Sequence, residues 1–155
     1  MPHILIVCTA NICRSPVAKA VLQDRLQKRG LIGWLVDSAG TWAVEEREAS
    51  QYSTEVMHEK GFDLSNHRAQ MVTNEMLKTA DLILCMETGH VEALHAEFPR
   101  YADKIYLLSQ MIGKRFSISD PYGGPLEEYQ SMAKEITNII DEGLERIIEL
   151  ARVDN

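Results

Sequence analysis

Four short apolar runs, rich in β-branched side chains, limit most strongly what this chain can fold into. They cover His3 to Cys8, Trp34 to Ser38, Asp81 to Met86, and Lys104 to Leu108. The runs are largely continuous rather than alternating, which is typical of strands that are buried on both faces of a parallel sheet. We therefore expect four parallel strands.

Helical patterns fill the stretches between these runs. The expected helices cover Pro16 to Arg29, about Ser50 to Lys60, Thr73 to Thr79, His90 to Phe98, and about Leu126 to Ala151. Strands that alternate with helices predict an α/β fold, with a four-stranded parallel sheet, helices on both faces and right-handed crossovers.

Size and composition narrow the class of protein. A chain of 155 residues with 45% hydrophobic residues suits a single domain over residues 1–155. No apolar stretch approaches the roughly 18 residues of a membrane span. The first residues indicate a strand rather than a signal peptide, so we expect a cytoplasmic protein, with a monomer as the default oligomeric state. A net charge of −7 is a poor match for nucleic acid or an anionic membrane.

The segment from Cys8 to Ser15 lies between the first expected strand and the first expected helix. Ligands of parallel sheets bind beyond the carboxyl ends of the strands, so this loop is well placed to bind one. Ser15 can cap the helix and Pro16 fits its first turn. The backbone N–H groups can then surround a phosphate at the positive end of the helix. Arg14 adds a guanidinium group that holds two phosphate oxygens.

Cys8 lies at the base of this predicted phosphate loop. The helix end and the arginine favour a thiolate, and the Ser15 hydroxyl can donate a hydrogen bond to it. Cys8 is otherwise explained as a small buried residue that ends a strand. Asn11 tolerates the left-handed backbone that a tight loop needs. The expected phosphate-binding residues are Thr9, Ala10, Asn11, Ile12, Cys13 and Ser15.

This loop resembles the signature of the low-molecular-weight protein tyrosine phosphatases. Four further segments resemble that family in the same order: residues 37–41, 67–69, 81–86 and 120–122. The resemblance implies a four-stranded parallel sheet and a Cys8 nucleophile that hydrolyses phosphotyrosine through a phosphocysteine intermediate. It implies no metal and no cofactor. Its bacterial members suggest a tyrosine-phosphorylated protein, such as a tyrosine kinase, as the partner.

Asp120 lies in a segment whose proline and two glycines predict a loop. From the residues alone, Asp120 is either a turn residue or a proton donor. The resemblance implies that Asp120 protonates the leaving oxygen and then acts as the base for the attacking water.

Several other residues have both a functional and an ordinary explanation. Tyr122 is expected to form one wall of the cleft, and Trp42 forms the other wall or is an exposed loop residue. Ser38 and His67 match family positions that support the phosphate loop through hydrogen bonds to Asn11, although a strand-end serine and a satisfied histidine are common. The resemblance implies a reversible disulfide between Cys13 and Cys8, but packing under the loop also explains Cys13.

Three alternative functions share parts of this pattern. The related arginine phosphatases carry threonine in place of Ile12 and phenylalanine after their Asp-Pro pair, so Ile12 and Tyr122 favour phosphotyrosine, although loop packing also explains Ile12. Arsenate reductases of the same fold use two further neighbouring cysteines, whereas this chain has Cys85 alone in that region. A non-catalytic phosphate-binding module or thiol redox sensor needs the loop but not Asp120.

Overall fold

The computed structural model describes residues 1–152. Its single sheet has four parallel strands in the order β2-β1-β3-β4, which confirms the predicted architecture. The strands are β1 (His3–Cys8), β2 (Leu35–Gly40), β3 (Leu82–Cys85) and β4 (Ile105–Leu107). Strand β2 ends later than the sequence predicted because its pairing with β1 continues to Cys8 and Gly40.

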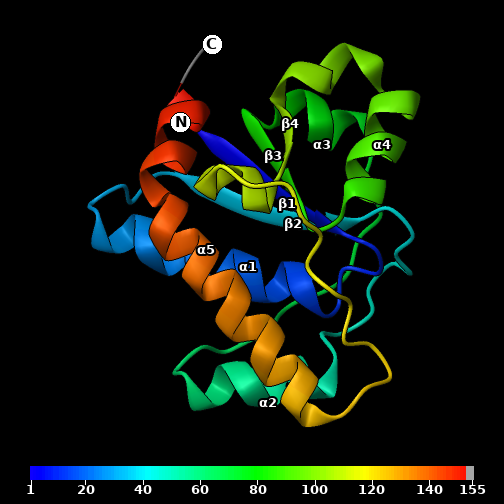
Figure 1. Ribbon diagram of the computed structural model, residues 1–155, viewed down its shortest axis with the longest axis vertical. Helices are drawn as coiled ribbons and strands as arrows, with labels where there is room; N and C mark the ends of the chain where they lie inside the picture. The colour runs from blue at the N-terminus through cyan, green and yellow to red at the C-terminus, as the bar shows by residue number, and fades with distance from the viewer. Residues whose placement is uncertain (153–155) are drawn as a thin grey trace.

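Helices cover both faces of the sheet (Figure 1). On one side lie α1 (Arg14–Lys28) and the long α5 (Leu126–Arg152), with α2 (Gln51–Glu59) packed against these two helices, and on the other side lie α3 (Asn74–Thr79) and α4 (Thr88–Glu97). Two short 3-10 helices flank β4, namely η1 (Pro99–Lys104) and η2 (Leu108–Ile112). Within residues 1–152, no helix is both long enough and apolar enough to cross a membrane.

Strand β1 divides the core into two parts. Ile4 and Ile6 belong to the cluster under α1 and α5, whereas Leu5 and Val7 belong to the cluster under α3 and α4. Because successive side chains of a strand point to opposite faces, both faces of β1 need apolar residues. The central position of β1 brings its carboxyl end, Cys8, to the middle of one sheet edge. The functional site is built at that edge.

Candidate active site

Cys8 contacts the first turn of α1. Its side chain is buried, and Sγ lies 3.0 Å from Ser15 Oγ. Asn11 Nδ2 donates to the same hydroxyl oxygen at 2.7 Å. Since Ser15 Oγ accepts from Asn11, its hydrogen is free to point at the Cys8 sulfur.

Ser15 does not cap the helix, so that part of the sequence prediction is wrong. Helix α1 begins at Arg14, and Cys13, which precedes it, makes no side-chain capping bond. The backbone enters the helix before Ser15, so the serine side chain faces the loop interior instead of the first N–H groups of the helix. Pro16 lies in the first turn, as predicted.

Asn11 holds the phosphate loop in shape. It is fully buried and has a φ of 61°, the left-handed conformation expected for it. Its Nδ2 also donates to Ser38 Oγ at 3.0 Å, and its carbonyl oxygen accepts from His67 Nε2 at 2.6 Å. The sequence predicted these two supporting residues but not Gln70, whose N–H donates to Asn11 Oδ1 at 3.0 Å. Burial lowers the pKa of His67, so the ring favours its neutral form.

Gly40 allows the end of β2 to approach the phosphate loop closely. A Cβ atom at this position would overlap the carbonyl oxygen of Thr9 and lie 3.1 Å from Asn11 N. The following backbone is tied to the same loop, because Thr41 N donates to Cys8 O at 3.0 Å and Trp42 N donates to Thr9 O at 2.9 Å. The loop is therefore fixed from the β2 side by main-chain contacts.

Arg14 is buried, and its Nη1 has two hydrogen-bond partners, whereas its Nε has none among residues 1–152. Nη1 donates to the Glu87 carboxylate and, at 2.6 Å, to the carbonyl oxygen of Ile118. Nη2 lies 3.6 Å from Asp120 Oδ2, and Nε has no hydrogen-bond partner among residues 1–152. A buried guanidinium with an unpaired Nε suits a bidentate contact to two oxygens of one anion through Nε and Nη2.

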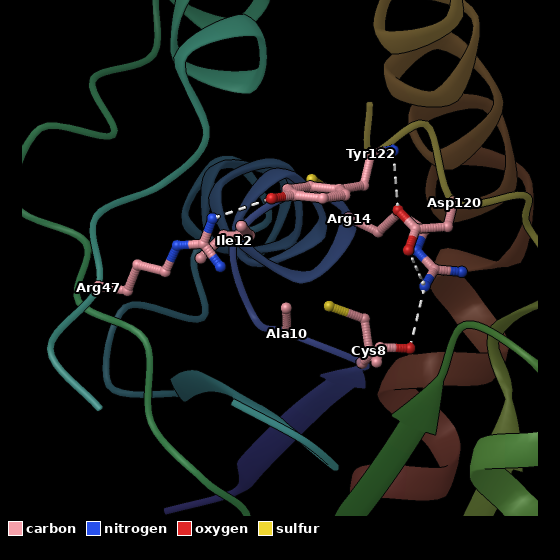
Figure 2. A pocket seen from close by; sticks show the side chains of 9 residues that line it. Cys8, Ala10, Ile12, Arg14, Arg47, Asp120 and Tyr122 are labelled. Atoms are coloured by element: carbon pink, nitrogen blue, oxygen red, sulfur yellow. Dashed lines mark hydrogen bonds and ion pairs between the residues drawn. The ribbon is translucent and has the colours of Figure 1, made fainter. Parts of the chain in front are cut away.

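A cavity of about 220 Å³ opens in front of Arg14 (Figure 2). It is lined by Cys8, Thr9, Ala10, Ile12, Cys13, Arg14, Arg47, Asp120 and Tyr122. Asn11 and Ser15 do not line it, because both are buried behind the loop and support it from there. The cavity thus brings together Cys8, Arg14 and Asp120, the three residues that the sequence analysis singled out as catalytic candidates.

Asp120 reaches the cavity from the loop that precedes α5. Its Oδ1 accepts from the Tyr122 N–H at 3.1 Å, which fixes the carboxylate within its own turn. Figure 2 shows Asp120 on the same cavity as Cys8, beside the Arg14 guanidinium. The Asp120 side chain is 42% exposed to solvent, so water reaches it. This placement allows proton exchange with a group bound above Cys8.

Arg47 forms the second wall of the cavity, and Trp42 is the exposed loop residue that the sequence analysis gave as its alternative. Trp42 is 79% exposed and is not among the described residues that line the cavity. Arg47 Nη2 donates to the Tyr122 hydroxyl at 3.3 Å, and its Cζ lies 5.7 Å from the centre of that ring. The Arg47 backbone is held in place, since its carbonyl accepts from Ala69 N at 2.7 Å.

All three cysteines are reduced and buried. Cys13 lines the cavity with Cys8, and its Sγ lies 3.7 Å from the Tyr129 hydroxyl. Burial raises the pKa of Cys13 and of Cys85, so both favour the neutral thiol. Burial also raises the pKa of Tyr129 to about 12.

Three charged or titratable residues of the site were missed by sequence reasoning. Glu87 and His90 follow β3 directly, and the carboxyl ends of parallel strands share one sheet edge, so their position was a usable signal. Arg47 gave no such signal, because it lies in an acidic stretch, Glu45 to Glu48, that is typical of a solvated loop.

A buried arginine and a cysteine lie on one loop at the carboxyl end of a parallel sheet, an arrangement that suits the binding of a phosphate group. The family model described as low molecular weight phosphotyrosine protein phosphatase matches residues 3–152. The chain belongs to this family, and it is a phosphatase.

Its relatives are named either as arginine phosphatases or as tyrosine phosphatases. A protein-arginine-phosphatase of Geobacillus stearothermophilus is 38% identical over 95% of this chain and 97% of its own length. A probable low molecular weight protein-tyrosine-phosphatase, EpsP of Ralstonia nicotianae, is 35% identical over 93% of this chain and 94% of its own. A crystal structure of a low molecular weight protein tyrosine phosphatase from T. tengcongensis superimposes with a TM-score of 0.89 at 39% identity, covering 94% of this chain and 99% of that one.

Proposed function

We propose that this protein hydrolyses phosphotyrosine in other proteins, with Cys8 as the nucleophile. The observation that carries the proposal is that Cys8 lies on the same cavity as Arg14, whose Nε has no partner within residues 1–152. An oxyanion held by Nε and Nη2 of the arginine presents its phosphorus to a sulfur at the base of the loop.

The first step transfers the phosphoryl group to the enzyme. The Cys8 thiolate attacks phosphorus, the S–P bond forms, and the bond from phosphorus to the phenolic oxygen breaks. Asp120 gives its proton to that oxygen, so the tyrosine leaves as a neutral phenol. Arg14 and the backbone N–H groups of the phosphate loop hold the equatorial oxygens. The Ser15 hydroxyl stabilises the sulfur when it is an anion.

The second step releases phosphate. Water attacks the phosphocysteine from the side that the phenol has left, and Asp120 now takes a proton from that water. The S–P bond breaks, inorganic phosphate forms, and Cys8 returns as a thiolate that the Ser15 hydroxyl again stabilises.

The walls of the cavity favour an aromatic substrate over phosphoarginine. Ile12 and Tyr122 offer apolar and aromatic surface to a phenyl ring. Arg47 places a positive charge at the same wall, where it repels the guanidinium of phosphoarginine and attracts acidic residues that flank a phosphotyrosine. The second candidate function, protein arginine phosphatase, is favoured by the name of the Geobacillus relative.

The proposed partner is a tyrosine-phosphorylated protein of the cytoplasm, such as a tyrosine kinase. We infer that residues 1–155 act as one phosphatase domain and as a monomer. The acidic net charge of −7 makes Arg14 and Arg47 the local positive field that draws an anionic side chain into the cavity.

The test compares a phosphotyrosine peptide with free phosphoarginine as substrates for the wild type and for Cys8→Ser. We expect the wild type to prefer phosphotyrosine and Cys8→Ser to be inactive on both. A preference for phosphoarginine would keep the mechanism but assign the second candidate function. Ile12→Thr is the matched variant, because it changes one wall of the cavity and should shift the preference toward phosphoarginine. If the reduced wild type turns over neither substrate, the chain is a binding module or a thiol sensor.

A further inference from the structure

The ring of His90 has a defined tautomer. This buried residue lies in the first turn of α4, and its Nδ1 is 3.1 Å from the backbone nitrogen of Glu87. A backbone N–H only donates, so Nδ1 must accept and carries no hydrogen. The ring proton of neutral His90 therefore lies on Nε2. Because Glu87 N–H donates to Nδ1, the Nε2–H group of His90 must act as the donor in its next hydrogen bond.

That chain continues to the Thr9 hydroxyl. His90 Nε2 lies 2.8 Å from Thr9 Oγ1 and donates to it, and Arg14 Nη2 donates to the same oxygen at 3.4 Å. A hydroxyl oxygen has two lone pairs, and these two donors occupy both of them. The hydroxyl hydrogen must point elsewhere, and no described residue accepts it.

The cavity in front of Arg14 is open to this hydrogen, because Thr9 lines it. Thr9 is half-buried and lines the cavity together with Cys8 and Arg14. A hydroxyl hydrogen that has no acceptor in the protein can donate to an oxyanion that binds in the same cavity. We propose that the Thr9 hydroxyl donates a hydrogen bond to the phosphoryl group bound in this cavity, and that His90 is the positioning residue that orients it.

This inference rests on the proposed function only in that the cavity binds a phosphoryl oxyanion. The Thr9 hydroxyl would be a further donor to the oxyanion, besides the backbone N–H groups of the loop and the Nε and Nη2 groups of Arg14. Burial, followed by the positive charge of Arg14, lowers the pKa of His90 to about 4. The ring is thus neutral at physiological pH, which is the state that the tautomer requires.

A structural role for the same contacts makes different predictions. If Thr9 and His90 only tie the phosphate loop to the start of α4, removing the contact loosens the loop and affects every reaction of Cys8. If the Thr9 hydroxyl contacts the oxyanion, its loss weakens the binding of oxyanions and leaves the reaction of Cys8 with neutral reagents unchanged.

The experiment therefore uses two probes on each variant. Orthovanadate inhibition, measured with 4-nitrophenyl phosphate as substrate, reports the oxyanion contact, and alkylation of Cys8 by iodoacetamide reports the loop. Thr9→Val removes the hydroxyl and keeps the branched shape, whereas Thr9→Ser keeps the hydroxyl. His90→Phe removes both ring nitrogens, and His90→Gln restores a donor near the position of Nε2.

We expect Thr9→Val to weaken vanadate binding and kcat/KM by roughly 10-fold or more, the range for a hydrogen bond to a charged group. Alkylation should stay within about twofold of the wild type. Thr9→Ser and His90→Gln should retain most of the binding. His90→Phe should lose several-fold, and the double variant should lose no more than Thr9→Val alone, because the two residues act in series.

Two results would overturn the inference. One is vanadate binding in Thr9→Val within twofold of the wild type. The other is an equal loss in vanadate binding and in alkylation, which would assign Thr9 a structural role. Melting temperatures of all variants show whether they are folded, and vanadate binding is measured in the folded Thr9→Ser and His90→Gln pair if a larger change unfolds the chain. Vanadate binding does not depend on the natural substrate, so failure of the phosphotyrosine proposal stays distinguishable.

Discussion

The Ser15 hydroxyl lies 3.0 Å from Cys8 Sγ and is oriented toward it, because Asn11 Nδ2 occupies a lone pair of the same oxygen. We predict that Ser15→Ala lowers kcat by about 10-fold or more, since the hydrogen bond that stabilises the Cys8 thiolate as it leaves phosphorus in the second step is lost. Alkylation of Cys8 by iodoacetamide at neutral pH should also slow. Unchanged alkylation together with normal kcat would contradict the assigned role of Ser15.

Asp120 should matter most when the leaving group is poor. Its carboxylate can exchange protons with a bound substrate, since within residues 1–152 its polar partners are Tyr122 N and the Arg14 guanidinium. Asp120→Asn should lower kcat/KM for phenyl phosphate by roughly 100-fold or more, the lower end for general acid catalysis. The loss should be smaller for 4-nitrophenyl phosphate, whose leaving group needs no proton. Equal losses on the two substrates would argue against proton donation by Asp120.

His90 should make the protein less stable in mild acid. Its pKa is about 4 in the fold and 6.5 ordinarily, so between these values the unfolded chain binds a proton that the fold does not. Stability is therefore lost as the pH falls from 6.5 toward 4, by about 2 kcal/mol between pH 7 and pH 5. Arg14 opposes protonation of the ring, while Glu87 and Asp120 favour it.

Urea unfolding at pH 7 and pH 5 measures this contribution. The matched control is His90→Gln, which does not titrate and should lose about 2 kcal/mol less than the wild type over the same interval. His67 has a pKa shift of the same sign, but it is present in both proteins and cancels. An identical pH dependence in the two proteins would show that His90 is not held neutral.

Arg47 and Tyr122 should act together on substrate preference. Arg47→Ala removes the charge at the cavity wall and should raise KM a few-fold for an acidic phosphotyrosine peptide, in line with exposed cation–π and ion contacts. Tyr122→Phe is the control, because it removes only the hydroxyl that accepts from Arg47. The effect of Arg47→Ala should shrink at high salt. If the increase in KM caused by Arg47→Ala is the same at low and high salt, the electrostatic explanation is excluded.

The sequence predicts the sheet and the chemistry more fully than the walls of the cavity. A continuous apolar run such as residues 3–8 indicates by itself a strand that is buried on both faces. The loop between this strand and the first helix then places Cys8 and Arg14 at the end of the sheet. The positions of Ser38 and His67 beside Asn11 also followed from the family resemblance.

Residues that depend on loop geometry could not be placed in the same way. Trp42 follows β2, but the course of the chain beyond Gly40 turns its side chain to solvent and brings Arg47 to the cavity instead. Glu46 in this loop has a left-handed backbone, with a φ of 70°, and a glutamate gives no indication of that conformation in the sequence. The orientation of the Thr9 hydroxyl was inferred from its contacts with His90 and Arg14, two residues that are far from Thr9 or separated from it by a loop in the sequence.

The most direct test of the account is to identify the residue that carries phosphate during turnover. The wild type is quenched in acid during steady-state hydrolysis of 4-nitrophenyl phosphate, digested, and mapped by mass spectrometry. We predict one phosphoryl group on the peptide that contains Cys8, and none in Cys8→Ala, which should also be inactive. A phosphoryl group on another residue, or full turnover by Cys8→Ala, would contradict the central claim.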